Sequence, residues 1–192
     1  AIVTGASRGL GKGCASVLAS EAGYTVYATG RTTADLEKLA AECAAAGKGK
    51  IIPCSLDQKD DDAVQAFVSK VKAEAGKFVL LVNSAYQGLE AQKPYFAKRF
   101  YERPIAEFDA HMNVGVRSSY VMASLVAPIM VEAKQGLIVQ ISSTGGAQYL
   151  FNTPYGVAHA AMDRLTADMA AELTELGVQC VTLWPLSCVT EK

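Results

Sequence analysis

The chain has 192 residues and an almost balanced charge. Hydrophobic residues make up 51% of it and charged residues 19%, as in an ordinary globular protein. A formal net charge of −1 gives no electrostatic reason to expect a nucleic acid or a membrane surface as partner. The length favours a single domain over residues 1–192.

The sequence is also informative about membrane segments and about its own ends. No apolar run is long enough to span a bilayer, so we expect no transmembrane segment. The longest run, residues 118–131, is broken by Pro128, and we interpret it as a buried helix. The residues that begin at Ala1 do not have the pattern of a signal peptide, so we expect none. Because the chain begins within an apolar run and stops abruptly at Glu191-Lys192, we expect a domain truncated at both ends.

Five cysteines indicate the redox environment. Their number is odd, and no close pair has the spacing of a zinc site or a thioredoxin motif. We therefore expect no metal site, and free thiols that mostly fill the core in a reducing compartment such as the cytoplasm. These residues are Cys14, Cys43, Cys54, Cys180 and Cys188.

Short β-rich runs alternate with helical periodicity along the chain. The expected strands are residues 2–4, 25–29, 50–54, 78–83, 137–142 and 179–183. Several are continuous apolar runs, which is typical of strands buried on both faces. The alternation predicts an α/β fold, a doubly wound parallel sheet of the Rossmann type with right-handed crossovers.

Glycines and one aspartate mark the ends of the expected helices. Gly23, Gly47, Gly76 and Gly177 each follow a helical stretch, where glycine adopts a left-handed cap at little cost. Asp61 is the expected N-cap of the third helix. The least regular region, residues 85–104, is expected near the carboxyl ends of the strands, where ligands bind in such folds.

A glycine-rich turn follows the first strand and opens the first helix. The first glycine permits a sharp turn, and the others allow a pyrophosphate to approach and the helix to pack closely. The helix N-terminus then offers unpaired N–H groups to the anion. The expected phosphate-binding turn comprises Gly5, Ser7, Arg8, Gly9, Leu10 and Gly11.

The choice of nucleotide should be set after the second strand. An acidic residue there would bind a ribose 2′-hydroxyl, but this sequence has Arg31. Arg31, helped by Arg8, could pair with a 2′-phosphate, which favours NADP over NAD. The alternative interpretation is that both are solvated surface arginines.

The spacing Thr-Gly-x-x-x-Gly-x-Gly at residues 4–11 resembles that of the short-chain dehydrogenase/reductase superfamily. Further landmarks follow in the family's order across nearly the whole chain. By resemblance, Asp57 lies near the adenine, Asn83 and Ala85 belong to the cofactor-binding segment after the fourth strand, and Pro185 and Thr190 belong to the loop after the sixth. The same resemblance implies the catalytic set Asn113, Ser143, Tyr155 and His159, of which Tyr155 and His159 also contact the cofactor.

The resemblance implies hydride transfer between a nicotinamide and a carbonyl or alcohol carbon of a small molecule. Tyr155 would be the general acid, and Ser143 would donate to the substrate oxygen, with Ser142 as the alternative. Asn113 would hold a relay water, or would only bridge backbone groups. The family commonly forms homodimers or homotetramers through two helices, and residues 118–131 and 160–173 are compatible with this.

One subgroup of the superfamily shares further residues with this chain. Gln135-Gly136-Leu137-Ile138-Val139, Pro154-Tyr155-Gly156-Val157 and Leu183-Trp184-Pro185 resemble its segments. That resemblance implies an NADP-linked carbonyl reductase that is cytoplasmic or peripheral to the endoplasmic reticulum. A relative acting on nucleotide sugars would need a substrate domain after Lys192, for which the sequence gives no support.

Position 159 departs from the family pattern, which has lysine there. Imidazole is shorter, and its unperturbed pKa is about 6.5, so at neutral pH it stabilises a phenolate weakly. Losing a tuned acid typically costs about 10²–10⁴ in rate. One hypothesis is a slow reductase that works best below neutral pH. The other is a catalytically impaired NADP-binding module with a regulatory or interaction role. Arg164 is poorly spaced to substitute for the lysine.

The substrate pocket is less clearly marked. Leu186 replaces the glycine of a Pro-Gly pair in the family pattern, so the backbone there approaches the nicotinamide less closely. Several aromatic residues favour a pocket for a hydrophobic carbonyl compound, although they could equally be ordinary core or loop residues. They are Tyr86, Tyr95, Phe96, Tyr149 and Phe151.

Overall fold

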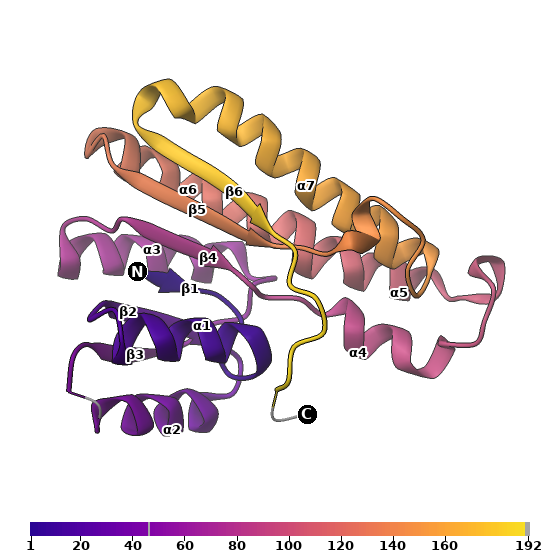
Figure 1. Cartoon of the computed structure of the whole chain (residues 1–192), viewed down its shortest axis with the longest axis horizontal. Helices are drawn as coiled ribbons and strands as arrows, with labels where there is room; N and C mark the ends of the chain where they lie inside the picture. Colours follow the sequence, from indigo (N-terminus) through magenta and orange to yellow (C-terminus); the bar gives the residue numbers. More distant parts are fainter. Residues whose placement is uncertain (46, 191–192) are drawn as a thin grey trace.

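The computed structural model describes residues 1–45 and 47–190, and within them it shows one parallel sheet flanked by helices (Figure 1). The strand order is β3-β2-β1-β4-β5-β6, the order of doubly wound dinucleotide-binding folds. The prediction of the fold class is therefore confirmed. The strands are β1 (Ile2–Val3), β2 (Thr25–Gly30), β3 (Lys50–Ser55), β4 (Leu80–Asn83), β5 (Gly136–Ile141) and β6 (Val178–Leu183).

Helices cover both faces of the sheet. Helices α1 and α2 pack on one face, while α3, α6 and α7 pack on the other. Helices α4 and α5 lie beyond the carboxyl ends of the strands, at the right of Figure 1. The helices are α1 (Gly9–Ser20), α2 (Thr33–Ala44), α3 (Asp61–Ala75), α4 (Gly88–Gln92), α5 (Ile105–His111), α6 (Ser118–Glu132) and α7 (Thr153–Leu173).

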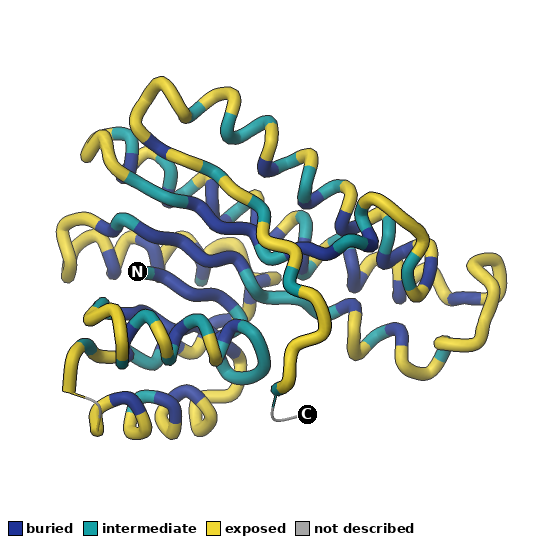
Figure 2. The backbone as a smooth tube through the Cα atoms, in the orientation of Figure 1, coloured by how far each residue is buried: buried dark blue, intermediate teal, exposed yellow. Residues whose placement is uncertain are grey.

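The continuous apolar runs of the strands explain the two layers. Successive side chains of a strand point to opposite faces, so Ile2 and Leu81 pack with α3 and α6 while Val3 and Val82 pack with α1 and α2. The centre of the sheet is accordingly buried (Figure 2). At the β6 edge the pattern changes, and Leu183 is 50% exposed.

The helix ends agree with the glycine signals but not with the expected cap of α3. Gly23, Gly47, Gly76 and Gly177 all have positive φ. The N-cap of α3 is Asp60, whose carboxylate accepts from the Ala63 N–H at 3.0 Å, so the prediction for Asp61 is wrong by one residue. Asp61 instead lies in the first turn and pairs with Arg117 of the neighbouring helical segment.

The apolar helix α6 covers the run predicted as a buried helix, residues 118–131, and ends one residue later. It continues through Pro128, which lies on the exposed side, where water can satisfy the carbonyl that proline leaves without a donor. By length and composition, the helical stretch Ile105–Glu132 could cross a membrane. That is weak support for a membrane span, because Met122, Val126 and Met130 of α6 are fully buried in the core of the domain.

Candidate active site

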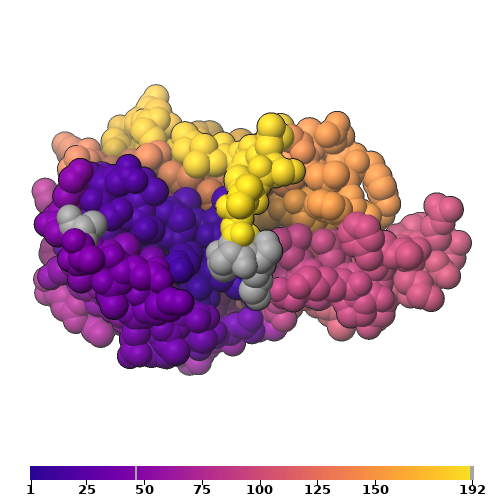
Figure 3. All heavy atoms as spheres, turned by 60° about the horizontal axis from the view of Figure 1, so that its bottom comes forward, coloured from indigo at the N-terminus to yellow at the C-terminus, as the bar shows by residue number. Residues whose placement is uncertain are grey.

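A cleft of about 800 Å³ opens at the carboxyl ends of the strands, where the strand order reverses between β1 and β4. The stretch after β6 lies between the N-terminal half and the segment around α4 and α5 (Figure 3). The residues that both line this cleft and were predicted as site residues are Gly5, Ser7, Arg8, Gly9, Leu10, Gly11, Arg31, Asp57, Ala85, Ser143, Tyr155, His159, Pro185 and Thr190.

The glycine turn is tied directly to the segment after β4. Gly5 has a φ of +66°, and a Cβ there would lie 2.7 Å from Ala85 Cα. The Thr4 hydroxyl accepts hydrogen bonds from the Ser84 and Ala85 N–H groups at 3.0 and 3.1 Å. The first glycine therefore permits both the turn and the close approach of a neighbouring loop.

The other two glycines serve different purposes. Gly9 has a φ of +57°, and a Cβ there would meet no described atom within 4 Å, so its α carbon faces open cleft at the start of α1. At Gly11 a Cβ would lie 2.4 Å from the Gly5 carbonyl oxygen, so this glycine lets α1 pack on the turn. A helix N-terminus whose N-cap residue makes no side-chain cap hydrogen bond, beside an open backbone cradle, fits the phosphates of a dinucleotide.

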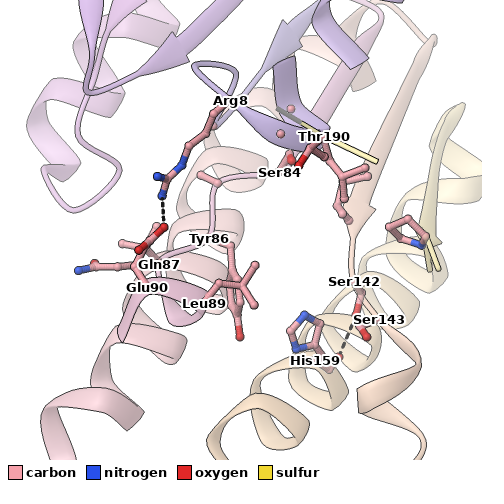
Figure 4. A pocket seen from close by; sticks show the side chains of 18 of the residues that line it. Arg8, Ser84, Tyr86, Gln87, Leu89, Glu90, Ser142, Ser143, His159 and Thr190 are labelled. Atoms are coloured by element: carbon pink, nitrogen blue, oxygen red, sulfur yellow. Dashed lines mark hydrogen bonds and ion pairs between the residues drawn. The ribbon is translucent and has the colours of Figure 1, made fainter. Parts of the chain in front are cut away.

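Charged residues line the same end of the cleft. Arg8 forms an ion pair with Glu90 of α4 at 3.2 Å, and the two join opposite sides of the cleft (Figure 4). Arg31 is exposed just after β2, where a 2′-phosphate would be recognised in this fold. Asp57 follows β3, and its carboxylate accepts from the Lys59 N–H at 3.0 Å. The cleft therefore offers two arginines near the glycine turn.

Tyr155 is placed by the first turn of α7. Asn152 caps that helix by accepting from the Tyr155 N–H at 2.8 Å. The phenol ring lies against Gly145, where a Cβ would approach it to 2.5 Å. Tyr155 is 7% exposed, and burial raises its pKa, while a hydrogen bond with Ser143 lowers it. The hydroxyl is thus protonated at neutral pH and lies beside Ser143.

The two neighbouring serines have different partners. The Ser142 hydroxyl donates to the His159 carbonyl at 3.3 Å, which ties the end of β5 to α7 (Figure 4). The Ser143 hydroxyl accepts from the Gly145 N–H at 3.1 Å and bonds with Tyr155. Ser143 therefore shares the reacting side of Tyr155, whereas Ser142 is engaged with backbone.

His159 stacks against Tyr155 one helical turn away. The ring centroids are 4.0 Å apart and the planes differ by 30°. Nδ1 lies 2.8 Å from the Tyr155 carbonyl, which can only accept, so Nδ1 carries the proton and Nε2 of the neutral ring has a lone pair. Burial lowers the pKa of His159, opposed by the Tyr155 carbonyl and by Asp163. Unlike lysine, this residue is therefore uncharged at neutral pH.

Two predicted residues do not reach the cleft. Asn83 is buried, and its side-chain amide donates to the Ser119 carbonyl at 3.4 Å. Asn113 is exposed in the segment Met112–Arg117, where Val114 and Gly115 depart from helical geometry, and it is not among the lining residues. The role expected for Asn113 as holder of a relay water is not supported by this placement.

Three of the five aromatic residues predicted to line the pocket do so, and two do not. Tyr86, Phe96 and Phe151 line the cleft. Phe151 packs edge-on against Tyr155 at a centroid distance of 4.9 Å and has a φ of +63°, which is unusual for a residue with a side chain. Tyr149 is 82% exposed and Tyr95 lies outside the lining. Part of the cleft lining is therefore aromatic.

A buried polar row beside the cleft was not foreseen from the sequence. Arg103 Nη1 lies 2.5 Å from Glu107 Oε1, and His111 Nε2 lies 3.8 Å from the same oxygen. The side chains are 3%, 0% and 0% exposed. Their spacing of four residues was the available signal, since residues at i and i+4 share a helix face. No group of three metal-ligating side chains occurs in the described part of the chain.

Comparison with known sequences identifies relatives over the whole chain. Residues 1–192 match the family described as short chain dehydrogenase. The chain is 44% identical over 191 residues to human dehydrogenase/reductase SDR family member 1, covering 99% of this chain and 60% of that protein. It is 34% identical over 192 residues to a short chain dehydrogenase of Pseudocercospora fijiensis, again over 60% of the relative. The chain therefore spans about three fifths of the length of these relatives.

Solved structures share the fold closely. A metagenomic short-chain oxidoreductase in complex with NADP superposes with a TM-score of 0.87 at 32% identity, covering 98% of this chain and 82% of the other. A 7α-hydroxysteroid dehydrogenase complexed with NADH and 7-oxo glycochenodeoxycholic acid gives a TM-score of 0.87 at 27% identity, covering 99% and 71%. Similar structures therefore include one with NADP and one with NADH.

Proposed function

This chain belongs to the short-chain dehydrogenase/reductase family, and on that premise we propose that it reduces the carbonyl of a hydrophobic small molecule with NADPH, or oxidises the alcohol in the reverse direction. The observation that supports this most strongly is the convergence of Ser143, Tyr155 and His159 on a cleft whose other end is the glycine turn. Family membership supports the oxidoreductase class, and the site geometry supports the roles of individual residues.

Each of these residues has a defined task. The bound cofactor supplies or accepts the hydride. The Ser143 hydroxyl donates to the substrate oxygen and holds it beside Tyr155. The Tyr155 hydroxyl then gives its proton to that oxygen as charge develops there. Phe96 and Phe151 line the cleft with ring centroids 6.0 Å apart, and they would help to exclude water from the reacting groups.

His159 determines how readily Tyr155 gives up its proton. A charged imidazolium 4.0 Å from the phenol ring would stabilise the phenolate, whereas the neutral ring offers only a lone pair at Nε2. Because burial lowers the pKa of His159 below its ordinary value near 6.5, the charged form appears only as the pH falls below that value. Activity should therefore rise from neutral toward mildly acidic pH.

The preference for NADP rests on two arginines. Arg31 lies where the family's NAD-binding members place an acidic residue, and Arg8 lies in the turn itself. Arg8 is paired with Glu90, so binding a 2′-phosphate would exchange a partly exposed ion pair for a charge-assisted hydrogen bond. Asp57 borders the region that would hold the adenine.

A second candidate is a catalytically impaired NADP-binding module with a regulatory or interaction role. The neutral, buried state of His159 favours it, because the cation of the usual catalytic pair is missing at neutral pH. Both candidates share the glycine turn and both bind the dinucleotide. Only turnover separates them.

The test is NADPH oxidation at pH 6 and pH 7.5 with a panel of aromatic and dicarbonyl compounds. Tyr155→Phe, which keeps the ring and removes only the hydroxyl, is the negative variant, and Tyr120→Phe on the exposed side of α6 is its matched control. We expect turnover that is lost in Tyr155→Phe and kept in Tyr120→Phe. Tight NADPH binding with no turnover at either pH would favour the non-catalytic module.

A further inference from the structure

Both histidines of the sequence lie in one cluster of rings at the cleft. Tyr86 is at its centre, with ring centroids 5.5 Å from His111 and 5.1 Å from His159. Tyr86 also packs edge-on against Tyr155 at 6.3 Å. In Figure 4 Tyr86 lies between the α4 wall of the cleft and His159. The pair Tyr155–His159 therefore contacts a second tyrosine–histidine pair, Tyr86–His111.

Two glycines make room for this second pair. A Cβ at Gly88 of α4 would lie 2.2 Å from His111 Nδ1, and a Cβ at Gly115 would lie 2.8 Å from the Tyr86 ring. Gly115 has a φ of +157°, a conformation that side-chain-bearing residues rarely adopt. The kinked segment between α5 and α6 thus leaves space in which the Tyr86 ring packs beside His159.

The hydroxyl of Tyr86 forms a hydrogen bond with His111 Nδ1. Burial raises the pKa of Tyr86, with further contributions from Tyr155 and Glu107, so the phenol stays protonated and donates. The His111 Nδ1 must then accept, which puts its proton on Nε2, the nitrogen nearest the Glu107 carboxylate. The Arg103 guanidinium compensates the negative charge of that carboxylate and also donates hydrogen bonds to the carbonyls of Lys98 and Phe96.

We infer that His111 is a positioning residue: its Nδ1 fixes the hydroxyl of Tyr86, and the Tyr86 ring fixes the imidazole of His159 against Tyr155. This inference rests on the proposed function, because positioning matters only if Tyr155 and His159 carry the chemistry. His111 itself touches neither the cofactor region nor the substrate region, since it does not line the cleft.

The two histidines are also coupled in charge. The groups facing His111 are Tyr86 before α4, Arg103 before α5, Glu107 within α5, and Tyr155 and His159 of α7. Burial, followed by His159 and Arg103, lowers the pKa of His111 to about 4. His111 is therefore neutral over the pH range in which His159 gains its proton, and remains an acceptor for Tyr86 there.

The test compares three variants in the full chain. His111→Leu removes the acceptor, whereas His111→Asn places an amide oxygen two bonds from Cβ, where Nδ1 now accepts. Tyr86→Phe removes the donor and keeps the ring. Misplacing a reacting group by about 1 Å costs up to about 100-fold in rate. We expect kcat to fall by about 10- to 100-fold in His111→Leu and in Tyr86→Phe, with a smaller change in KM and recovery in His111→Asn.

A readout that needs no turnover accompanies the kinetics. With only two histidines in the chain, each His111 variant leaves His159 as the sole source of imidazole signals in an NMR titration. We expect the pKa of His159 to move toward 6.5 in His111→Leu and in Tyr86→Phe, to return in His111→Asn, and to stay unchanged in the control Tyr120→Phe.

An unchanged His159 titration in both His111→Leu and Tyr86→Phe would overturn the positioning role, whatever the turnover. If all variants titrate as expected but the native chain turns over no substrate at any pH, the proposed function fails while the contact network stands. Should His111→Leu not fold, Tyr86→Phe keeps the packing of the ring and decides the question by itself.

Discussion

Gly11 and Gly13 lie about 3 Å apart along the axis of α1. The same glycine-to-alanine substitution can therefore be compared at the two positions. At Gly13 no described atom lies within 4 Å of the new Cβ, and the position is exposed. Gly13→Ala should therefore gain only the helix propensity of alanine, about 1 kcal/mol. At Gly11 the new Cβ would lie 2.4 Å from the Gly5 carbonyl oxygen and 2.8 Å from its carbon.

The contacts at Gly11 are with backbone, so no side chain can rotate away. Relieving them requires α1 to shift from the turn, and overpacking of this kind costs about 1–3 kcal/mol. Since both variants gain the same propensity, their unfolding free energies should differ by about 1–3 kcal/mol. The shift also moves the N–H groups of α1 away from the phosphates. We expect NADPH to bind Gly11→Ala at least about tenfold more weakly, a loss of roughly 1.4 kcal/mol.

Urea denaturation measures the first quantity, and the fluorescence of NADPH on titration measures the second. Gly13→Ala is the matched control, because it makes the same change in the same helix. If Gly11→Ala were as stable as Gly13→Ala and bound NADPH equally well, the packing of α1 on the turn would not be what this structure shows. The assignment of the turn as a phosphate site would then lose its main support.

Three further outcomes follow from the site and its surroundings. Arg103→Met should lower the free energy of unfolding, measured in urea, by about 3–5 kcal/mol, because it leaves the buried Glu107 carboxylate uncompensated. The double variant Arg103→Met/Glu107→Leu should recover most of this loss. Equal stability of the native chain, the single variant and the double variant would contradict this account. The pKa of His111 is about 4 in the folded chain and near 6.5 in the unfolded chain. Its contribution to the free energy of unfolding, on the order of 3 kcal/mol, is therefore present above pH 6.5 and lost as the pH falls from about 6.5 to 4. His111→Asn should flatten the dependence of stability on pH over this range. Arg31→Asp should shift the preference from NADPH toward NADH, and an unchanged ratio of the two dissociation constants would show that Arg31 is a solvated surface residue.

The sequence was sufficient for the fold because its signals are local and repeated. Apolar runs bounded by glycines predicted each strand to within about two residues, and the turn at residues 4–11 was recognisable from its spacing. The same locality explains the error at the start of α3. Asp60 and Asp61 are both good caps, and only the backbone conformation selects Asp60.

The site was only partly predictable for a related reason. Tyr155 and His159 are one helical turn apart, so their contact follows from spacing. The position of the Asn113 side chain depends on the path of the chain through the kink at Val114 and Gly115, which no local sequence pattern predicts. In the structure Asn113 is exposed. The Tyr86–His111 contact joins segments 25 residues apart and requires the tertiary fold.

The charge on His159 is the central claim about activity, and the pH dependence of kcat in the native chain and in His159→Lys tests it most directly. A lysine keeps its charge at neutral pH, since its unperturbed pKa is about 10.4. We predict that native turnover rises as the pH falls below about 6.5, and that His159→Lys is faster than the native chain at pH 7.5, by up to about 10²–10⁴, with little dependence on pH between 6 and 7.5. Parallel pH profiles of equal height for the two proteins would contradict this claim.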